Sequence, residues 1–253
     1  MKSTYLLIDL FSVLVPFIFS FHPRLKFYQR WQALFPAMIA TGIIFIAWDM
    51  YFTHLKIWGF NSAYLTGAYI GNLPVEEVLF FLCIPYSCLF TYTCLNSMIK
   101  VSVSKKAQSI ISLSLIGLSV FMAIRFHTLD YTCAAFAALA ILIFTAQYIL
   151  KVTWIFKFYV TYLVLLLPFL IVNGLLTGTG LESPIVWYNT AHIINLRILT
   201  IPFEDIFYGM GLILLNIMIY SGLSARVYQK RKSRRRSFIN ATNQSYTNAN
   251  TIS

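Results

Sequence analysis

Hydrophobic side chains in this chain fall into long runs, separated by short segments that are rich in basic and polar residues. A helix needs about 20 apolar residues to cross the hydrocarbon core of a bilayer. Runs of this length predict seven membrane-spanning helices, at residues 4–20, 32–51, 74–96, 108–126, 131–150, 156–175 and 202–222. The pattern therefore predicts an all-α integral membrane protein.

The composition and the placement of charge support this class. The chain is 59% hydrophobic and 11% charged, whereas soluble domains carry about 25% charged residues. The net charge is +11, and most of the basic residues lie in alternate connections, at 22–30, 100–106, 151–157 and 226–237. The positive-inside rule places these segments in the cytoplasm. We predict a multi-pass protein of the cell membrane, with the N-terminus outside and a basic cytoplasmic C-terminus that favours anionic lipid over nucleic acid.

The chain has only eight acidic residues, and this topology puts all of them outside or in the outer half of the membrane. The pairs Glu76–Glu77 and Glu204–Asp205 each follow a proline at the start of a span. Acids in a first helical turn are also ordinary capping residues. However, Asp9 and Asp49 do not open helices. A shared polar pocket between the first, second, third and seventh spans accounts better for the whole set.

The acidic pairs belong to an internal repeat. "NLPVEEVLFF" at 72–81 matches "TIPFEDIFYG" at 200–209, and "FIAWD" at 45–49 matches "FLIVN" at 169–173. Units that begin four spans apart enter the membrane in the same direction, which predicts parallel repeats with both motifs at one depth. The predicted organisation has two parallel three-helix repeats, at 1–100 and 131–225. A connecting helix at 101–130 joins them, and a basic, disordered tail follows at 226–253.

Adjacent helical residues point about 100° apart, so one acid of each pair can face the pocket. We predict that Glu76 and Glu204 point inward, because they hold the same place in both motifs, and that Glu77 and Asp205 are second acids or hydrogen-bond partners. Arg197 precedes the second motif without a counterpart in the first. Arg197 could pair with Glu204 or Asp205. A role for Arg197 as an anchor at the membrane interface is an equal alternative.

The sequences "PVEEVLFFLCIPYSCLFTY" at 74–92, "RILTIPFEDIFYG" at 197–209 and "WDMYFTHLKIWGFN" at 48–61 resemble the membrane-integral lycopene beta-cyclases. The resemblance covers about residues 1–222 and includes the duplication, since each subunit of the two-subunit bacterial form resembles one half of this chain. It implies conversion of lycopene through gamma-carotene to beta-carotene. It also implies that the paired acids are catalytic: Glu76, Glu77, Glu204 and Asp205.

This reaction suits carboxyl groups. A protonated carboxyl would protonate the terminal double bond, ring closure would follow, and a carboxylate would remove a proton. Aromatic faces stabilise cations. The residues predicted to contact the substrate or the cation are Asp49, Asn173, Arg197, Phe80, Phe81, Tyr86, Phe207 and Tyr208.

No cofactor is expected, because the reaction has no net redox change and the chain has no dinucleotide-binding glycine motif. The spacing of the histidines and cysteines predicts no metal site. The expected partners are a carotenoid within the bilayer and membrane lipid, with association with other carotenoid-pathway enzymes left open.

A proton- or cation-coupled membrane transporter is the alternative, because parallel repeats and acids within the membrane also suit transport. The acids gather on one side instead of forming a path, which favours the cyclase. A retinal protein is excluded because the seventh span has no lysine. A prenyltransferase would need aspartate-rich motifs, which the acidic pairs do not match.

Overall fold

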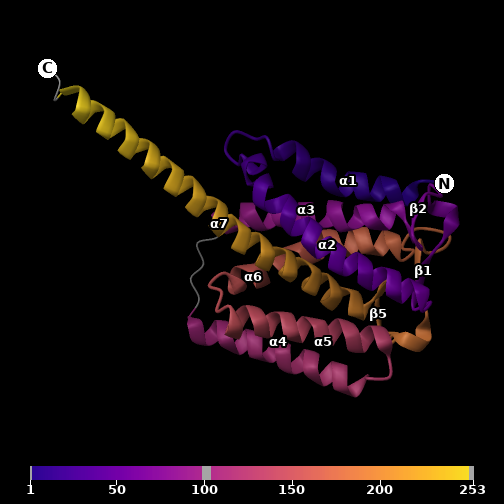
Figure 1. Cartoon of the computed structure of the whole chain (residues 1–253). Coiled ribbons are helices and arrows are strands. Elements are labelled where there is room, and N and C mark those ends of the chain that lie inside the picture. The colour runs from indigo at the N-terminus through magenta and orange to yellow at the C-terminus, as the bar shows by residue number, and fades with distance from the viewer. Residues whose placement is uncertain (1, 99–103, 251–253) are drawn as a thin grey trace.

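The fold, taken from a computed structural model, is a bundle of seven long helices, described here for residues 2–98 and 104–250 (Figure 1). The helices are α1 Thr4–Phe19, α2 Trp31–His54, α3 Val75–Met98, α4 Lys105–Arg125, α5 Asp130–Phe144, α6 Ile155–Leu176 and α7 Phe203–Asn250. A π-helical turn, η3 Thr145–Ile149, prolongs α5, and three short 3-10 helices lie in connections: η1 Phe27–Arg30, η2 Ser62–Tyr64 and η4 Thr190–His192.

Six helical segments are long and apolar enough to cross a membrane, and α1 is a shorter apolar helix of 16 residues. Their outward faces carry large hydrophobic side chains such as Phe11, Phe121 and Leu167, each more than 60% exposed. Apolar side chains on the outside of a bundle fit a lipid surrounding. The prediction of an all-α, multi-pass membrane protein with seven helices is confirmed.

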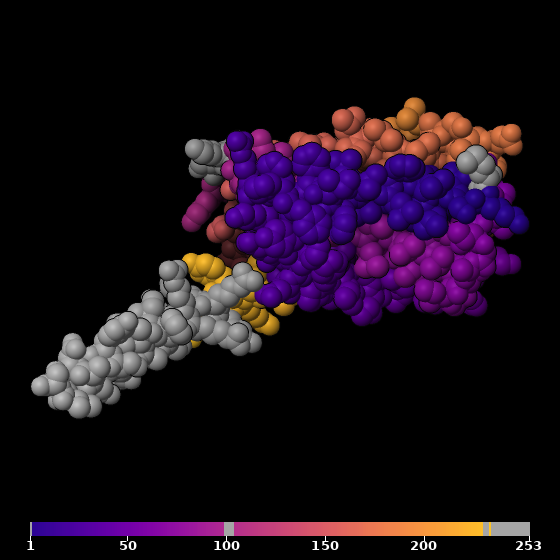
Figure 2. All heavy atoms as spheres, turned by 90° about the horizontal axis from the view of Figure 1, so that it is seen from above, coloured from indigo at the N-terminus to yellow at the C-terminus, as the bar shows by residue number. Residues whose placement is uncertain are grey.

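The two repeats form the two sides of the bundle. In the first, α3 packs against α1 and α2; in the second, α7 packs against α5 and α6. The halves meet where α2 packs on α7 and α3 on α6, and α4 lies along α5 as the connecting helix. Seen from above, the first half covers most of one face, and the orange second half lies along its edge (Figure 2).

Six short strands gather at one end of the bundle, which we call the strand end (Figure 1). Trp58–Phe60 (β1) pairs antiparallel with Val186–Tyr188 (β4), with Gly59 opposite Trp187. Each half also has its own hairpin before its last helix: Tyr69–Ile70 (β2) with Leu73–Pro74 (β3), and Arg197–Ile198 (β5) with Ile201–Pro202 (β6).

The strand end repeats the same backbone in both halves. Each element of the first loop recurs 128 positions later, as from Trp58 to Val186 and from Glu76 to Glu204. Asn61 and Asn189 each accept a hydrogen bond from the backbone N–H two residues later, at the start of η2 and η4. The β1–β4 pair therefore joins equivalent loops about a pseudo-two-fold axis, which fixes how the two halves face one another.

The end of the chain differs from the prediction. Residues 226–250, for which the polar composition predicted disorder, continue α7 as helix. No Gly or Pro interrupts the sequence between Leu223 and Asn250, and these are the residues that stop helices most strongly. The basic tail therefore leaves the bundle at the end opposite the strands (Figure 1).

Candidate active site

A cavity of about 350 Å³ runs inside the bundle from the strand end toward its middle. Its lining on α3 extends from Glu77 to Thr91, a length of about 21 Å at 1.5 Å per residue. Strands β1 and β4 close it at the strand end through Trp58, Phe60, Val186 and Tyr188. The cavity is thus a narrow apolar space with a few polar groups at its closed end.

The carboxyl groups that line this cavity are the second acids of the two motifs, Glu77 and Asp205, together with Asp49. Each motif acid accepts a hydrogen bond from a tyrosine at the start of the first helix of its own half. Tyr5 donates to Glu77 Oε2 at 2.5 Å, and Tyr131 donates to Asp205 Oδ1 at 2.6 Å. The duplication has therefore brought two equivalent tyrosine–carboxyl pairs to one cavity.

Asp205 has two further donors. Asn173 Nδ2 lies 2.7 Å from Asp205 Oδ2, and the Tyr188 hydroxyl lies 2.9 Å from the same oxygen. Burial, and after it the negative charge of Asp205, raises the pKa of Tyr188 well above its ordinary value. Tyr188 therefore remains a neutral donor, and both oxygens of Asp205 are satisfied.

Asp49 holds the place in the first half that Asn173 holds in the second. Its Oδ1 accepts hydrogen bonds from Trp58 Nε1 and from Thr53, and its Oδ2 has no hydrogen-bond partner within the described residues. The carboxyl groups of Asp49 and Glu77 both line the cavity. Within the described residues no Lys, Arg or His side chain pairs with these acids; the salt bridge present joins His192 to Asp130 at the surface.

The first acids of the motifs, Glu76 and Glu204, do not line the cavity, so the prediction that they point inward is wrong. Both are fully buried and bind the backbone of the preceding loop. Glu76 Oε1 accepts from the N–H of Thr66 at 2.6 Å, and Glu204 Oε1 from the N–H of Ile194 at 2.7 Å. This repeated contact fixes the phase of each helix and turns the next residue toward the cavity.

The other residues were predicted to contact the substrate or the cation, and some line the cavity while others do not. Those that line it are Asp49, Asn173, Phe80, Phe81 and Tyr208.

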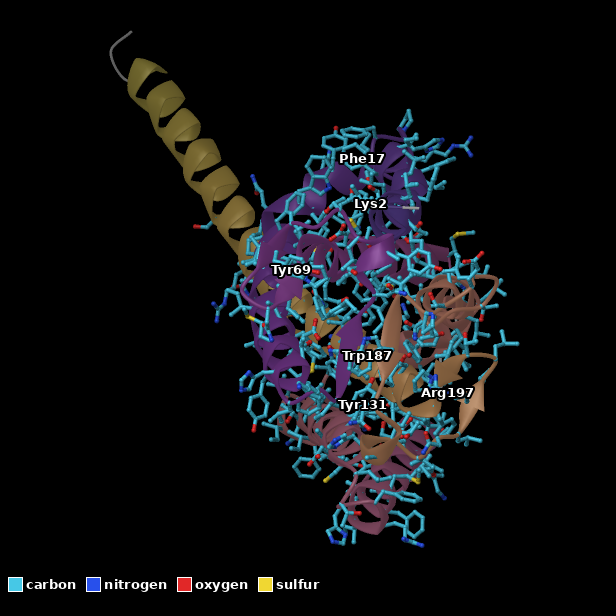
Figure 3. All side chains as sticks on the ribbon, turned by 90° about the vertical axis from the view of Figure 1, so that its right-hand side faces the viewer. Lys2, Phe17, Tyr69, Tyr131, Trp187 and Arg197 are labelled. Atoms are coloured by element: carbon cyan, nitrogen blue, oxygen red, sulfur yellow. The ribbon has the colours of Figure 1, made fainter. Side chains whose placement is uncertain are left out.

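Three predicted residues lie elsewhere. Tyr86 bonds to Ser20 Oγ at 2.5 Å, near the end opposite the strands, and Phe207 packs on Phe136 with ring centroids 4.5 Å apart. Arg197 does not pair with the acids: it is exposed at the edge of the strand end (Figure 3) and donates to the carbonyl of Thr200 at 2.6 Å.

Sequence reasoning missed Tyr5, Tyr131 and Tyr188. The first two could have been found, because they hold matching places at the start of each repeat, 72 and 74 residues before the carboxyl groups that they bind. Tyr188 gave no such signal, because its counterpart in the first half is Phe60. Within residues 2–98 and 104–250, no group of three or more His, Cys, Asp or Glu side chains could hold a metal ion.

Fold and site define a multi-pass membrane protein in which two repeats present buried carboxyl groups to one apolar cavity. The family model "Lycopene cyclase" matches the chain twice, over residues 2–95 and 130–223. The chain therefore belongs to the lycopene cyclase family, and this membership supports a carotenoid cyclase function. No curated protein and no solved structure matches it.

Proposed function

We propose that the protein closes the linear ends of lycopene into beta rings, giving gamma-carotene and then beta-carotene. The observation that carries the proposal is an elongated cavity that Glu77 and Asp205, from opposite halves, both line at the strand end of an apolar channel. A polyene can lie along the channel with one terminal isoprenoid unit beside both carboxyl groups.

The chemistry proceeds by proton transfer. One carboxyl protonates the terminal double bond, and the resulting tertiary cation is attacked by the neighbouring internal double bond to close a six-membered ring. The second carboxyl removes the proton that fixes the ring double bond in the beta position. The balance requires no electrons and no hydride, so we propose that no redox cofactor takes part in the ring closure itself.

The walls of the cavity protect the cation. Phe80, Phe81, Trp58 and Tyr208 line the same cavity as the carboxyl groups, and aromatic quadrupoles stabilise positive charge. Residues of β1 and β4 line the strand end of the cavity, and we expect them to limit the access of bulk water, so that the cation is deprotonated by the protein instead of being captured by water. Because both carboxyl sets share one cavity, we propose that the two ends of lycopene are cyclised in turn.

Expression in a bacterium that accumulates lycopene tests the proposal, with pigment chromatography as the readout and an empty vector as the control. Formation of beta-carotene is the expected result. Gamma-carotene alone would limit the reaction to one end. Unchanged lycopene, with the protein present in the membrane, would contradict the proposal.

A further inference from the structure

The two halves share a backbone but differ in the polar side chains around their acids. The clearest difference is Asp9 in α1, which is fully buried and has no hydrogen-bond partner for either carboxyl oxygen within the described chain. It lies one helical turn after Tyr5, on the face that also brings Ser12 to the cavity. At the matching place in the second half, four residues after Tyr131, stands Ala135.

The same imbalance extends through the site. Within the described chain Oε2 has no partner in either Glu76 or Glu204, but Oε1 of Glu76 accepts from the Thr66 N–H, whereas Oε1 of Glu204 accepts from both Thr132 Oγ1 at 2.6 Å and the Ile194 N–H.

At the level of the cavity, Glu77 receives the hydroxyl of Tyr5 and shares the lining with the carboxyl of Asp49, whereas Asp205 receives three neutral donors. Asp49 thus stands in the first half where the donor Asn173 stands in the second, and Asp9 stands where the second half has Ala135.

This arrangement has a direct electrostatic consequence. Asp9 lies buried on α1 one turn after Tyr5, whose hydroxyl binds Glu77, and no salt bridge within the described residues includes Asp9, Glu76 or Glu77. Buried like charges without donors are costly, so the first half gains from holding protons. Hydrogen bonds from neutral donors stabilise a carboxylate, so the second half gains from being ionised.

We propose that Asp9 is a positioning residue that keeps the first half of the site loaded with protons, so that Glu77 donates and Asp205 accepts. The inference rests on the proposed function. In each ring closure the proton of Glu77 forms the new C–H bond at the chain end, leaving a carboxylate. The internal double bond then forms the ring bond, and Asp205 takes the proton whose C–H electrons become the ring double bond. Return of one proton from the Asp205 side to the Glu77 side restores the starting state.

The test is the pH profile of the cyclisation rate, measured with the purified full-length chain in phosphatidylcholine vesicles that contain lycopene. The titratable groups facing Asp9 and Glu77 are Tyr5 from α1, Asp49 from α2, Glu76 and Cys83 from α3, Tyr188 from β4 and Tyr208 from α7. Asp9→Asn keeps the shape of the side chain and removes its charge. Asp9→Glu retains a carboxyl group. Thr41→Val is the packing control, because it removes a buried polar group that also has no hydrogen-bond partner in the described chain but cannot be charged.

We expect Asp9→Asn to move the alkaline limb of kcat to lower pH, because Glu77 then loses its proton more easily. A movement of about one pH unit lowers the rate about tenfold on that limb. The rate at acidic pH and the KM for lycopene stay unchanged, Asp9→Glu restores the wild-type profile, and Thr41→Val leaves it in place. An unmoved alkaline limb, an equal loss at every pH, or movement of the acidic limb would overturn the assignment.

A second variant tests the other half independently of whether Asp9→Asn folds. Asn173→Asp replaces a donor to Asp205 by an acid, so we expect the acidic limb of kcat to move to higher pH as Asp205 binds protons more readily. An unmoved acidic limb in a folded Asn173→Asp chain would also overturn the assignment. If the wild-type chain forms cyclised product but the variants do not move the limbs of the pH profile, the proposed function stands and this inference fails. If the wild-type chain forms no product, both the proposed function and this inference are refuted.

Discussion

Adjacent acids in the second motif should give opposite results on mutation. Asp205 lines the cavity and Glu204 binds the loop behind it. We therefore compare Asp205→Asn with Glu204→Gln, which change the same chemical group by the same amount at neighbouring positions.

The expected costs to stability are similar. In Asp205→Asn the amide oxygen can keep the bonds from Asn173 and Tyr188, and the amide nitrogen then meets the hydroxyl of Tyr131. In Glu204→Gln the amide oxygen can keep both donors to Oε1, and the nitrogen takes the place of Oε2, which has no partner. Each change leaves about one buried polar group poorly satisfied, at a cost of about 1–3 kcal/mol to the free energy of unfolding.

The expected effects on rate differ. Loss of a general acid or base lowers a rate by about 10²–10⁴-fold, or about 3–5 kcal/mol in the barrier. We expect a loss of this size for Asp205→Asn and less than about tenfold for Glu204→Gln, whose hydrogen bonds are retained. The assay is the initial rate of lycopene consumption, normalised to the folded protein in the membrane. Equal losses, or a greater loss in Glu204→Gln, would refute the assignment of the inner acids.

Two further predictions concern glycines. Gly209 lines the cavity where the first half has Phe81, and an added Cβ would lie 3.3 Å from the hydroxyl of Tyr162. Gly209→Phe should therefore raise the KM for lycopene or abolish turnover, whereas Gly211→Ala, outside the cavity lining, should leave both unchanged in the same vesicle assay. At the strand end, a Cβ on Gly59 would lie 2.3 Å from the ring of Trp187. Gly59→Ala should lower the free energy of unfolding by about 1–3 kcal/mol, measured by thermal unfolding in detergent, and Trp187→Ala in the same chain should recover part of this loss.

The bundle could be predicted from the sequence because lipid imposes a strong rule on composition. Helices that face hydrocarbon must be apolar over their whole length, so the seven segments stand out from the basic connections. The parallel repeat was equally visible, because both motifs open a span. The tail was predicted less well, since composition describes its solubility and not its backbone.

The site was harder to predict because helix phase is set by contacts distant in sequence. Glu76 and Glu204 were chosen as inward residues because they are identical in both motifs. Their identity reflects a shared structural task, the hydrogen bond to a loop N–H ten residues earlier. The position that differs, Glu77 against Asp205, is the one that faces the cavity. Here a difference between the repeats marked the cavity better than agreement did.

Duplication alone would give two equal sites, and the structure explains why one cavity serves both halves. A symmetric pair of carboxyl groups has no reason to donate a proton on one side and accept it on the other. Our proposal takes that direction from the divergence of the halves: Asn173 donates to Asp205 where the first half has Asp49, and Gly209 stands where the first half has Phe81. The repeated loops hold the carboxyl groups at one depth, and the unequal side chains around them make the halves chemically distinct. The proposed ring closure, which adds one proton and removes another, would need both properties.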